Sequence, residues 1–92
     1  MQEILSNNTQ NKIIIITGAT SGIGYALSEI YLKNNWIVIG LGRDKNKVKK
    51  FFIDFPDSFY FYQIDLNNFQ NTNKIFEEIF SKFKNINTFI LN

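Results

Sequence analysis

Gly18, Gly22 and Gly24 lie close together, directly after the apolar stretch IIII of residues 13–16. A continuous β-branched run of this kind is typical of a strand buried on both faces. The residues after the glycines carry a helical pattern, and a helix that begins there offers unpaired N–H groups and a positive dipole end. Glycine also lets the backbone approach a pyrophosphate closely. The stretch therefore predicts a phosphate-binding turn, with a tight turn that binds nothing as the alternative.

Two other phosphate loops do not fit this spacing. The loop G-x-x-x-x-G-K-[ST] needs a lysine that reaches the β- and γ-phosphates, but Gly24 is followed by Tyr25. The G-x-G-x-x-G loop fails as well, because the glycines here follow the pattern G-x-x-x-G-x-G. An ATPase or GTPase of the P-loop type is therefore not expected.

Strand and helix patterns alternate around and beyond this loop. Strands are predicted at four ranges: 12–17, 36–41, 58–64 and 88–91. Helices are predicted after the glycine loop, at 45–54 with Asp44 as the cap, and at 69–83, with a turn at 85–87. The β-α-β-α-β-α-β order predicts an α/β fold with a parallel sheet and right-handed crossovers.

Each predicted helix has an apolar face that should turn toward the core. The side chains on these three faces are Ile23, Ala26, Leu27, Ile30, Tyr31, Val48, Phe51, Phe52, Phe55, Ile75, Phe76, Ile79, Phe80 and Phe83. Four lysines at 45, 47, 49 and 50 alternate with the second of these faces, so they are interpreted as its solvated side rather than a nucleic-acid patch.

The composition excludes several classes of function. The chain has 92 residues, a net charge of +2 and 10 phenylalanines, which fits one small folded domain without nucleic acid as a default partner. It contains no cysteine and no histidine, so disulfides, thiolate or imidazole metal sites and a Ser-His-Asp triad are excluded. Residues 1–11 form a polar extension without a signal pattern, and no apolar run could span a membrane, so a cytoplasmic location is expected.

Three motifs together resemble the short-chain dehydrogenase/reductase family. TGATSGIG at residues 17–24 is similar to the family signature TGxxxGIG, and Asp65-Leu66 is similar to its Asp-[Val/Leu] pair beside the adenine ring. Asn92 ends TFILN, which resembles the start of the strand that leads into the family's N-A-G. The resemblance covers residues 12–92 and implies the first half of a Rossmann-type doubly wound sheet, with strand order 3-2-1-4.

The resemblance also implies a cofactor site for a nicotinamide dinucleotide. The residues predicted to bind it are Gly18, Thr20, Ser21, Gly22, Ile23, Gly24, Arg43, Asp65, Leu66 and Asn92. NAD-binding folds place an acid at the end of the second strand, whereas here Gly42 is followed by Arg43. Because a guanidinium suits a 2′-phosphate, NADP is preferred and NAD is the alternative. Asp44 could pair with Arg43 and weaken this preference, and Ser21 is not the basic residue that some NADP-dependent members carry.

The catalytic part of the family pattern does not occur in this sequence. The family transfers hydride with a Ser and a Tyr-x-x-x-Lys pair beyond N-A-G, and no lysine stands four positions after any of the four tyrosines. Residues 12–92 are therefore interpreted as a half-domain that stops before the catalytic half. The fourth strand would be an uncovered edge with Phe89 and Ile90 partly unpacked, so the chain should be marginally stable or self-associate.

Three functions remain open at this point. The first is the amino-terminal part of an NADP-dependent oxidoreductase acting on a carbonyl or alcohol substrate. The second is a free-standing dinucleotide-binding module without catalysis, and the third is an interaction protein that reuses the half-fold. The sequence that follows Asn92 would distinguish the first function from the other two.

Overall fold

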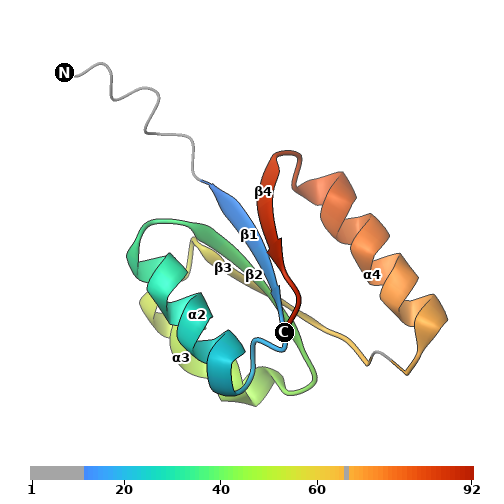
Figure 1. The fold of residues 1–92 in the computed structure, drawn as a ribbon, viewed down its shortest axis with the longest axis horizontal. Coiled ribbons are helices and arrows are strands. Elements are labelled where there is room, and N and C mark those ends of the chain that lie inside the picture. The colour runs from blue at the N-terminus through green and yellow to red at the C-terminus, as the bar shows by residue number, and fades with distance from the viewer. Residues whose placement is uncertain (1–11, 66) are drawn as a thin grey trace.

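A four-stranded parallel sheet lies between helices on both faces (Figure 1). The computed structural model describes residues 12–65 and 67–92. The elements are β1 (Ile13–Thr17), α2 (Gly22–Lys33), β2 (Ile37–Gly42), η1 (Lys45–Val48), α3 (Lys49–Asp54), β3 (Phe59–Gln63), α4 (Phe69–Lys82) and β4 (Ile86–Ile90). The strand order is β3-β2-β1-β4, which confirms the predicted topology. Within the described residues no helix is long and apolar enough to cross a membrane.

The isoleucines of β1 form the centre of two separate cores. Ile14 and Ile16 pack on the face covered by α2 and α3, while Ile13 and Ile15 pack on the face covered by α4. Because successive side chains of a strand point to opposite faces, a continuous apolar run is needed where both faces are covered. The IIII stretch is therefore explained by the central position of β1 between β2 and β4.

The buried face of α2 differs from the predicted apolar stripe. Its buried residues are Gly24, Ser28 and Leu32, whereas Ile23 and Ile30 have exposed fractions of 69% and 55%. Ala26 is also exposed, and Leu27 and Tyr31 are half-buried. The prediction was wrong because it equated apolar with buried, whereas this helix lies so close to the sheet that small side chains are required. The Ser28 hydroxyl can be buried because it donates to the Gly24 carbonyl oxygen at 2.8 Å.

The segment after β2 begins as a 3₁₀ turn and continues as α3. Asp44 caps it as predicted, since its carboxylate accepts a hydrogen bond from the Asn46 N–H at 3.0 Å. Val48 and Phe51 are fully buried, as expected for the inward face, and Phe52 and Phe55 are half-buried. The four lysines of this segment are exposed, in agreement with their interpretation as a solvated face.

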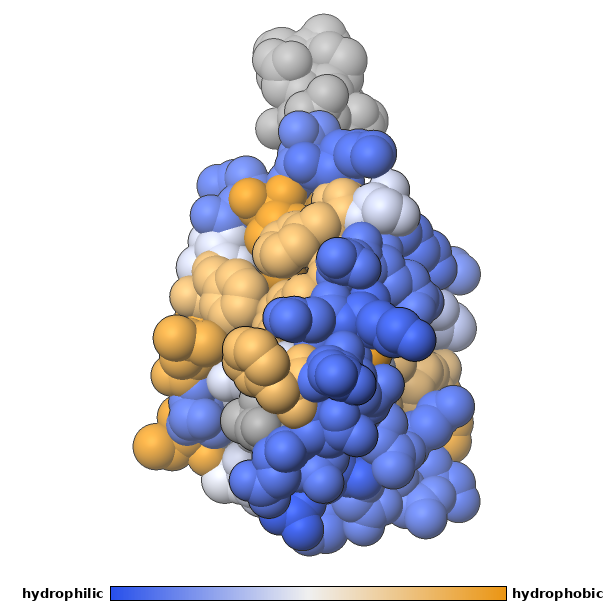
Figure 2. All heavy atoms as spheres, turned by 90° about the vertical axis from the view of Figure 1, so that its right-hand side faces the viewer, coloured by the Kyte–Doolittle hydropathy of each residue, from blue (hydrophilic) through white to orange (hydrophobic). Residues whose placement is uncertain are grey.

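On the other face, α4 ends one residue before the predicted boundary, and its apolar face is only partly covered. Ile79 and the C-cap residue Phe83 are buried, but Phe80 is 51% exposed and its inward assignment was wrong. The Phe80 ring packs along the helix instead, stacked on the Phe76 ring with 6.0 Å between the ring centroids. Figure 2 shows this side of the molecule, where apolar surface lies alongside the hydrophilic face of α4.

β4 begins two residues earlier than predicted. Ile86 and Asn87 belong to the strand and not to a turn. The register with β1 shifts between Ile13 and Ile14, whose partners are Ile86 and Thr88. Asn87 is thus the bulge residue, and its side-chain oxygen accepts a hydrogen bond from the Ile13 N–H at 2.9 Å. This bulge explains how an Asn fits within a strand.

Candidate functional site

A pocket of about 390 Å³ lies at the carboxyl ends of the strands. Its walls come from the loops that follow β1, β2 and β3 and from the residue that ends the chain. The lining residues are Thr17, Gly18, Thr20, Ser21, Leu41, Gly42, Arg43, Ile64, Asp65, Asn67 and Asn92. In open α/β sheets ligands bind outside the carboxyl ends of the strands, where the strand order changes direction. The order here changes direction at β1, which supplies the glycine loop.

The glycine loop can form only with glycine at its first and last positions. Gly18 has a φ of 64°, in the left-handed region, and an added Cβ would lie 2.9 Å from the Asn92 side-chain nitrogen. A Cβ on Gly24 would overlap the Gly18 carbonyl oxygen. The first turn of α2 therefore lies directly against the end of β1. Gly22 also has a positive φ of 53°, but the space around it is open.

The amino terminus of α2 keeps its donors available. Ser21 is the N-cap residue and has an extended backbone, yet its hydroxyl makes no capping hydrogen bond. The first backbone bond of the helix runs from the Tyr25 N–H to the Ser21 carbonyl oxygen at 3.3 Å. The N–H groups of residues 22–24 consequently have no acceptor from the helix itself. Together with the helix dipole, such donors favour an anionic ligand.

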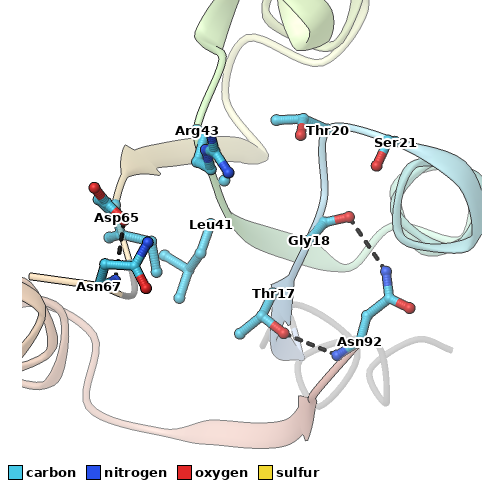
Figure 3. Close-up of a pocket in the computed structure, with 11 residues that line it drawn as sticks. Thr17, Gly18, Thr20, Ser21, Leu41, Arg43, Asp65, Asn67 and Asn92 are labelled. Atoms are coloured by element: carbon cyan, nitrogen blue, oxygen red, sulfur yellow. Dashed lines mark hydrogen bonds between the residues drawn. The ribbon is translucent and has the colours of Figure 1, made fainter.

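Asn92 ties the end of β4 to the glycine loop (Figure 3). Its backbone N–H donates to the Thr17 hydroxyl oxygen at 2.8 Å, and its side-chain amide donates to the Gly18 carbonyl oxygen at 3.3 Å. The Thr17 hydroxyl donates in turn to the Ile90 carbonyl oxygen at 3.4 Å. These hydrogen bonds fix the glycine loop against the end of β4, so Asn92 positions Thr17 and Gly18 in the pocket.

Arg43 follows directly after β2 and lines the pocket together with Thr20 and Ser21 (Figure 3). No acidic residue stands at the end of this strand. Asp44 does not form an ion pair with Arg43, because the ion pairs among the described residues join Glu29 to Lys33 and Lys50. The Asp44 carboxylate instead caps η1. The arginine is exposed, so its guanidinium is available to a ligand in the pocket.

Asp65 forms the opposite wall, at the end of β3 (Figure 3). Its carboxylate accepts a hydrogen bond from the Asn67 N–H at 3.0 Å, and its carbonyl oxygen accepts from the Asn68 N–H at 2.8 Å. These bonds form a turn that fixes the direction of the chain before α4. Leu66, the second member of the predicted pair, lies outside the described residues.

Most of the predicted site residues meet at this pocket. Six of them line it, namely Gly18, Thr20, Ser21, Arg43, Asp65 and Asn92. Gly22, Ile23 and Gly24 do not line it but form the first turn of α2 beside it. The sequence prediction missed the remaining walls: Thr17, Leu41, Gly42, Ile64 and Asn67. These residue types do not indicate a binding site in the sequence, and the residues come together only because the three loops converge.

A smaller cavity of about 240 Å³ adjoins the pocket beyond Arg43. It shares Arg43, Ile64 and Asp65 with the larger pocket and adds Gln63 and Asn71. Close to this side, burial raises the pKa of the Tyr62 phenol above its ordinary value, and the charges of Glu78 and Tyr60 raise it further. Among the described residues no group of three or more metal-ligating side chains is present.

Comparison with known proteins identifies similar sequences along most of the chain. Residues 12–92 match the short chain dehydrogenase family. A serine 3-dehydrogenase from Rhizobium radiobacter is 30% identical over 79 residues, covering 86% of this chain and 32% of the relative. An NADPH-dependent 3-dehydrocapnine reductase from Ornithobacterium rhinotracheale is 34% identical over 65 residues, covering 71% of this chain and 23% of the relative. The chain therefore spans about a third or less of the length of these relatives.

Solved structures show the same arrangement of strands and helices. A short chain dehydrogenase from Bacillus anthracis has a TM-score of 0.71 at 31% identity, covering 85% of this chain and 34% of that protein. A short-chain dehydrogenase from Streptomyces avermitilis has a TM-score of 0.81 at 20% identity, covering 97% of this chain and 30% of that protein. A third, from Escherichia coli, was solved with NADPH and has a TM-score of 0.77 at 21% identity, covering 90% of this chain and 37% of that protein.

Proposed function

Because the chain belongs to the short-chain dehydrogenase family, we propose that residues 12–92 bind NADP(H) as the cofactor-binding part of an oxidoreductase. When bound, the nicotinamide supplies or accepts a hydride. The residues described above contribute binding and orientation. The catalytic half of such an enzyme, with its Ser and Tyr-x-x-x-Lys residues and its substrate site, lies beyond Asn92 in this proposal.

The pyrophosphate is assigned to the first turn of α2. This assignment rests on the backbone, since Gly24 lets the first turn of α2 lie against the end of β1 and the N–H groups of residues 22–24 lack helical acceptors. Thr20 and Ser21 add hydroxyls on the same side of the pocket. The adenine is assigned to the opposite side, beside Asp65 and Leu66, as the resemblance to the family implies.

The preference for NADP over NAD rests on Arg43. An acid at the end of the second strand would accept hydrogen bonds from a free 2′-hydroxyl, but this strand ends in Gly42 and is followed by an arginine. The guanidinium lines the pocket and has no carboxylate partner among the described residues. It therefore suits a 2′-phosphate, with which it forms charge-assisted hydrogen bonds. The NADPH dependence of the 34% identical reductase supports this choice.

Titration of the chain with both cofactors tests the proposal. NADP⁺ should bind more tightly than NAD⁺, and Arg43→Ala should weaken NADP⁺ binding by about 10- to 100-fold while leaving NAD⁺ binding unchanged. Lys47→Ala is the matched control, because Lys47 is an exposed cation of the next turn that does not line the pocket. Isothermal titration calorimetry at constant ionic strength measures all of these affinities.

Two outcomes would contradict the assignment of Arg43. One is tighter binding of NAD⁺ than of NADP⁺ by the unsubstituted chain. The other is an equal loss of both cofactors in Arg43→Ala, which would indicate a general effect on the loop. Absence of any dinucleotide binding would instead contradict the cofactor assignment as a whole.

A free-standing dinucleotide-binding module without catalysis is the second candidate function. It is favoured by the pocket itself, because the loops after β1, β2 and β3 already bring their residues together there. The coding sequence after Asn92 distinguishes the two candidates. An Ala-Gly continuation followed by a Tyr-x-x-x-Lys pair supports the oxidoreductase, whereas a stop codon supports the module.

A further inference from the structure

Two backbone hydrogen bonds hold the end of β2 between the glycine loop and the end of β3. On one side, the Ala19 N–H of the loop donates to the Leu41 carbonyl oxygen at 3.0 Å. On the other side, the Ile64 N–H donates to the Gly42 carbonyl oxygen at 2.8 Å. Because adjacent residues of β2 are bound from both sides, the end of this strand cannot move away from the loop without breaking a hydrogen bond.

Gly42, the last residue of β2, faces the side chain of Thr20 in the glycine loop. Its φ is not in the left-handed region, unlike those of Gly18 and Gly22, so its backbone would accept a residue other than glycine. What is missing is space, because an added Cβ would lie 2.5 Å from the Thr20 Cγ2 atom and 3.2 Å from its Oγ1 atom. Since carbon atoms pack at about 3.5–4.0 Å, Thr20 restricts position 42 to glycine.

Thr20 has little freedom to give way to such a side chain. Its Cβ carries two heavy atoms, which restricts rotation about χ1, and both already lie beside position 42. The loop backbone is fixed as well, because Ala19, directly before Thr20, is fully buried and bound to Leu41. Ala19 also packs against Gly40, where an added Cβ would lie 3.0 Å from the Ala19 Cβ. A side chain at position 42 would therefore displace Thr20 and the loop that carries it.

Position 42 is also the place where an acid would select the cofactor. Gly42 lines the pocket directly before Arg43. In NAD-binding folds an acid at the end of the second strand accepts a hydrogen bond from the ribose 2′-hydroxyl. The same carboxylate would repel a 2′-phosphate, because both groups are negatively charged. An acid at position 42 would therefore favour NAD and disfavour NADP.

We propose that Thr20 determines cofactor specificity through position 42, because its methyl group fills the space of a side chain there and keeps an acid from the end of β2. This inference rests on the proposed function and deepens it. Arg43 attracts the 2′-phosphate, and Thr20 excludes the acid that would repel it; Figure 3 shows both residues on the same side of the pocket. The role belongs to the methyl group and is separate from the hydroxyl that Thr20 offers to the pocket.

The first experiment measures the contact between Thr20 and position 42 without any cofactor. Gly42→Ala should lower the urea midpoint of the chain, because its Cβ meets the Thr20 methyl group. Thr20→Ser removes that methyl group and keeps the hydroxyl, so in the Gly42→Ala background it should restore at least about half of the loss. Gly40→Ala is the matched control from the same strand. Its Cβ would meet Ala19 and the Phe59 ring, so Thr20→Ser should restore nothing there.

The second experiment measures the affinities for NAD⁺ and NADP⁺ by calorimetric titration. Gly42→Asp alone should bind both dinucleotides weakly, because the new side chain displaces the loop that holds the pyrophosphate. The double variant, Gly42→Asp with Thr20→Ser, should bind NAD⁺ about 10- to 100-fold more tightly than the single variant. Its affinity for NADP⁺ should stay low, since the carboxylate meets the 2′-phosphate. The double variant should therefore prefer NAD⁺, the reverse of the unsubstituted chain, and this comparison does not depend on how Gly42→Asp alone folds.

Three outcomes would overturn the role of Thr20 while NADP⁺ still binds to the unsubstituted chain. Gly42→Asp alone could bind NAD⁺ as tightly as the double variant, so that Thr20 excludes nothing. The double variant could recover both cofactors equally, which would indicate a repaired loop without a change in specificity. Thr20→Ser could also stabilise Gly40→Ala as much as Gly42→Ala. Failure of the proposed function is different, because the unsubstituted chain would then bind neither dinucleotide; the specificity role would fall with it, and the urea midpoints would report a packing contact only.

Discussion

The two long helices contact the sheet in opposite ways. α2 meets it through Gly24, Ser28 and Leu32, and its backbone comes closer to the strands than that of α4. α4 meets it through large side chains, of which Ile79 and the C-cap Phe83 are buried. Close packing fixes the amino terminus of α2 at the end of β1, where a ligand can use its N–H groups. Packing through large rings instead leaves an apolar flank beside the sheet.

This difference indicates what each helix does for the protein. The position of α2 determines the geometry of the pocket, so its small residues are needed for binding as well as for packing. α4 contributes no lining residue to the larger pocket, and its apolar residues Ile75, Phe76 and Ile79 pack in the core on that face of the sheet. A substitution on the sheet-facing side of α2 should therefore affect cofactor binding, and a substitution of a buried residue of α4 should affect stability alone.

Gly24→Ala should have the largest effect. The new Cβ would overlap the Gly18 carbonyl oxygen, and because that atom belongs to the backbone, the loop or the whole helix must move. We expect a loss of about 4 kcal/mol in the free energy of unfolding, together with loss of dinucleotide binding. Urea denaturation measures the first quantity and calorimetric titration the second.

Gly22→Ala is the matched control for this substitution. Gly22 has a positive φ, but no atom lies within 4 Å of the position of its Cβ. Only backbone strain of about 1 kcal/mol is expected there. Equal losses in the two variants would show that the close contact between α2 and the end of β1 does not determine the loop geometry.

Ile79→Ala should cost about 3 kcal/mol, because it removes a fully buried side chain from the core between α4 and the sheet. Cofactor affinity per folded molecule should not change, since Ile79 does not line the pocket. Phe80→Ala, on the exposed flank of the same helix, is the control and should cost less, because Phe80 is 51% exposed. A fall in cofactor affinity in Ile79→Ala would break the division of roles between the two helices.

The sequence predicted the architecture well because the strong signals are local. The isoleucine run, the glycine loop and the Asp44 cap each follow from a few neighbouring residues, and their order determines the topology. The buried face of α2 was not predictable in the same way. Periodicity assigns large apolar residues to the core, whereas here Gly24 and Ser28 are buried because the sheet is so near.

The walls of the pocket show a second limit of sequence reasoning. Arg43 was predicted because it follows the end of a predicted strand, and Asp65 was predicted because Asp65-Leu66 resembles a motif of the family. Leu41 and Ile64 have the types of ordinary core residues, and only the parallel sheet brings their ends to one place. The bulge at Asn87 was missed for a related reason, since its hydrogen bond to Ile13 joins residues far apart in the sequence.

The smallest effect on the free energy of unfolding is expected from ionisation of the Tyr62 phenol, on the face of the sheet that α4 covers. Burial, with help from Glu78 on α4, raises the pKa of the Tyr62 phenol above its unfolded value. The Tyr62 phenol therefore keeps its proton in the folded state at a pH where the unfolded state has lost it. This contribution to stability is fully present below about pH 10 and is lost as the pH rises through the folded pKa.

Urea midpoints measured between about pH 8 and about pH 11 test this dependence. Tyr62→Phe should flatten the alkaline part of the curve, and Glu78→Gln should flatten it less, because burial is the larger cause of the shift. Tyr25→Phe is the control from α2, the helix on the other face of the sheet, where Tyr25 stacks on Phe51. If Tyr25→Phe flattened the curve as much as Tyr62→Phe, the alkaline loss of stability would arise on both faces of the sheet and not on the α4 side alone, where Glu78 lies.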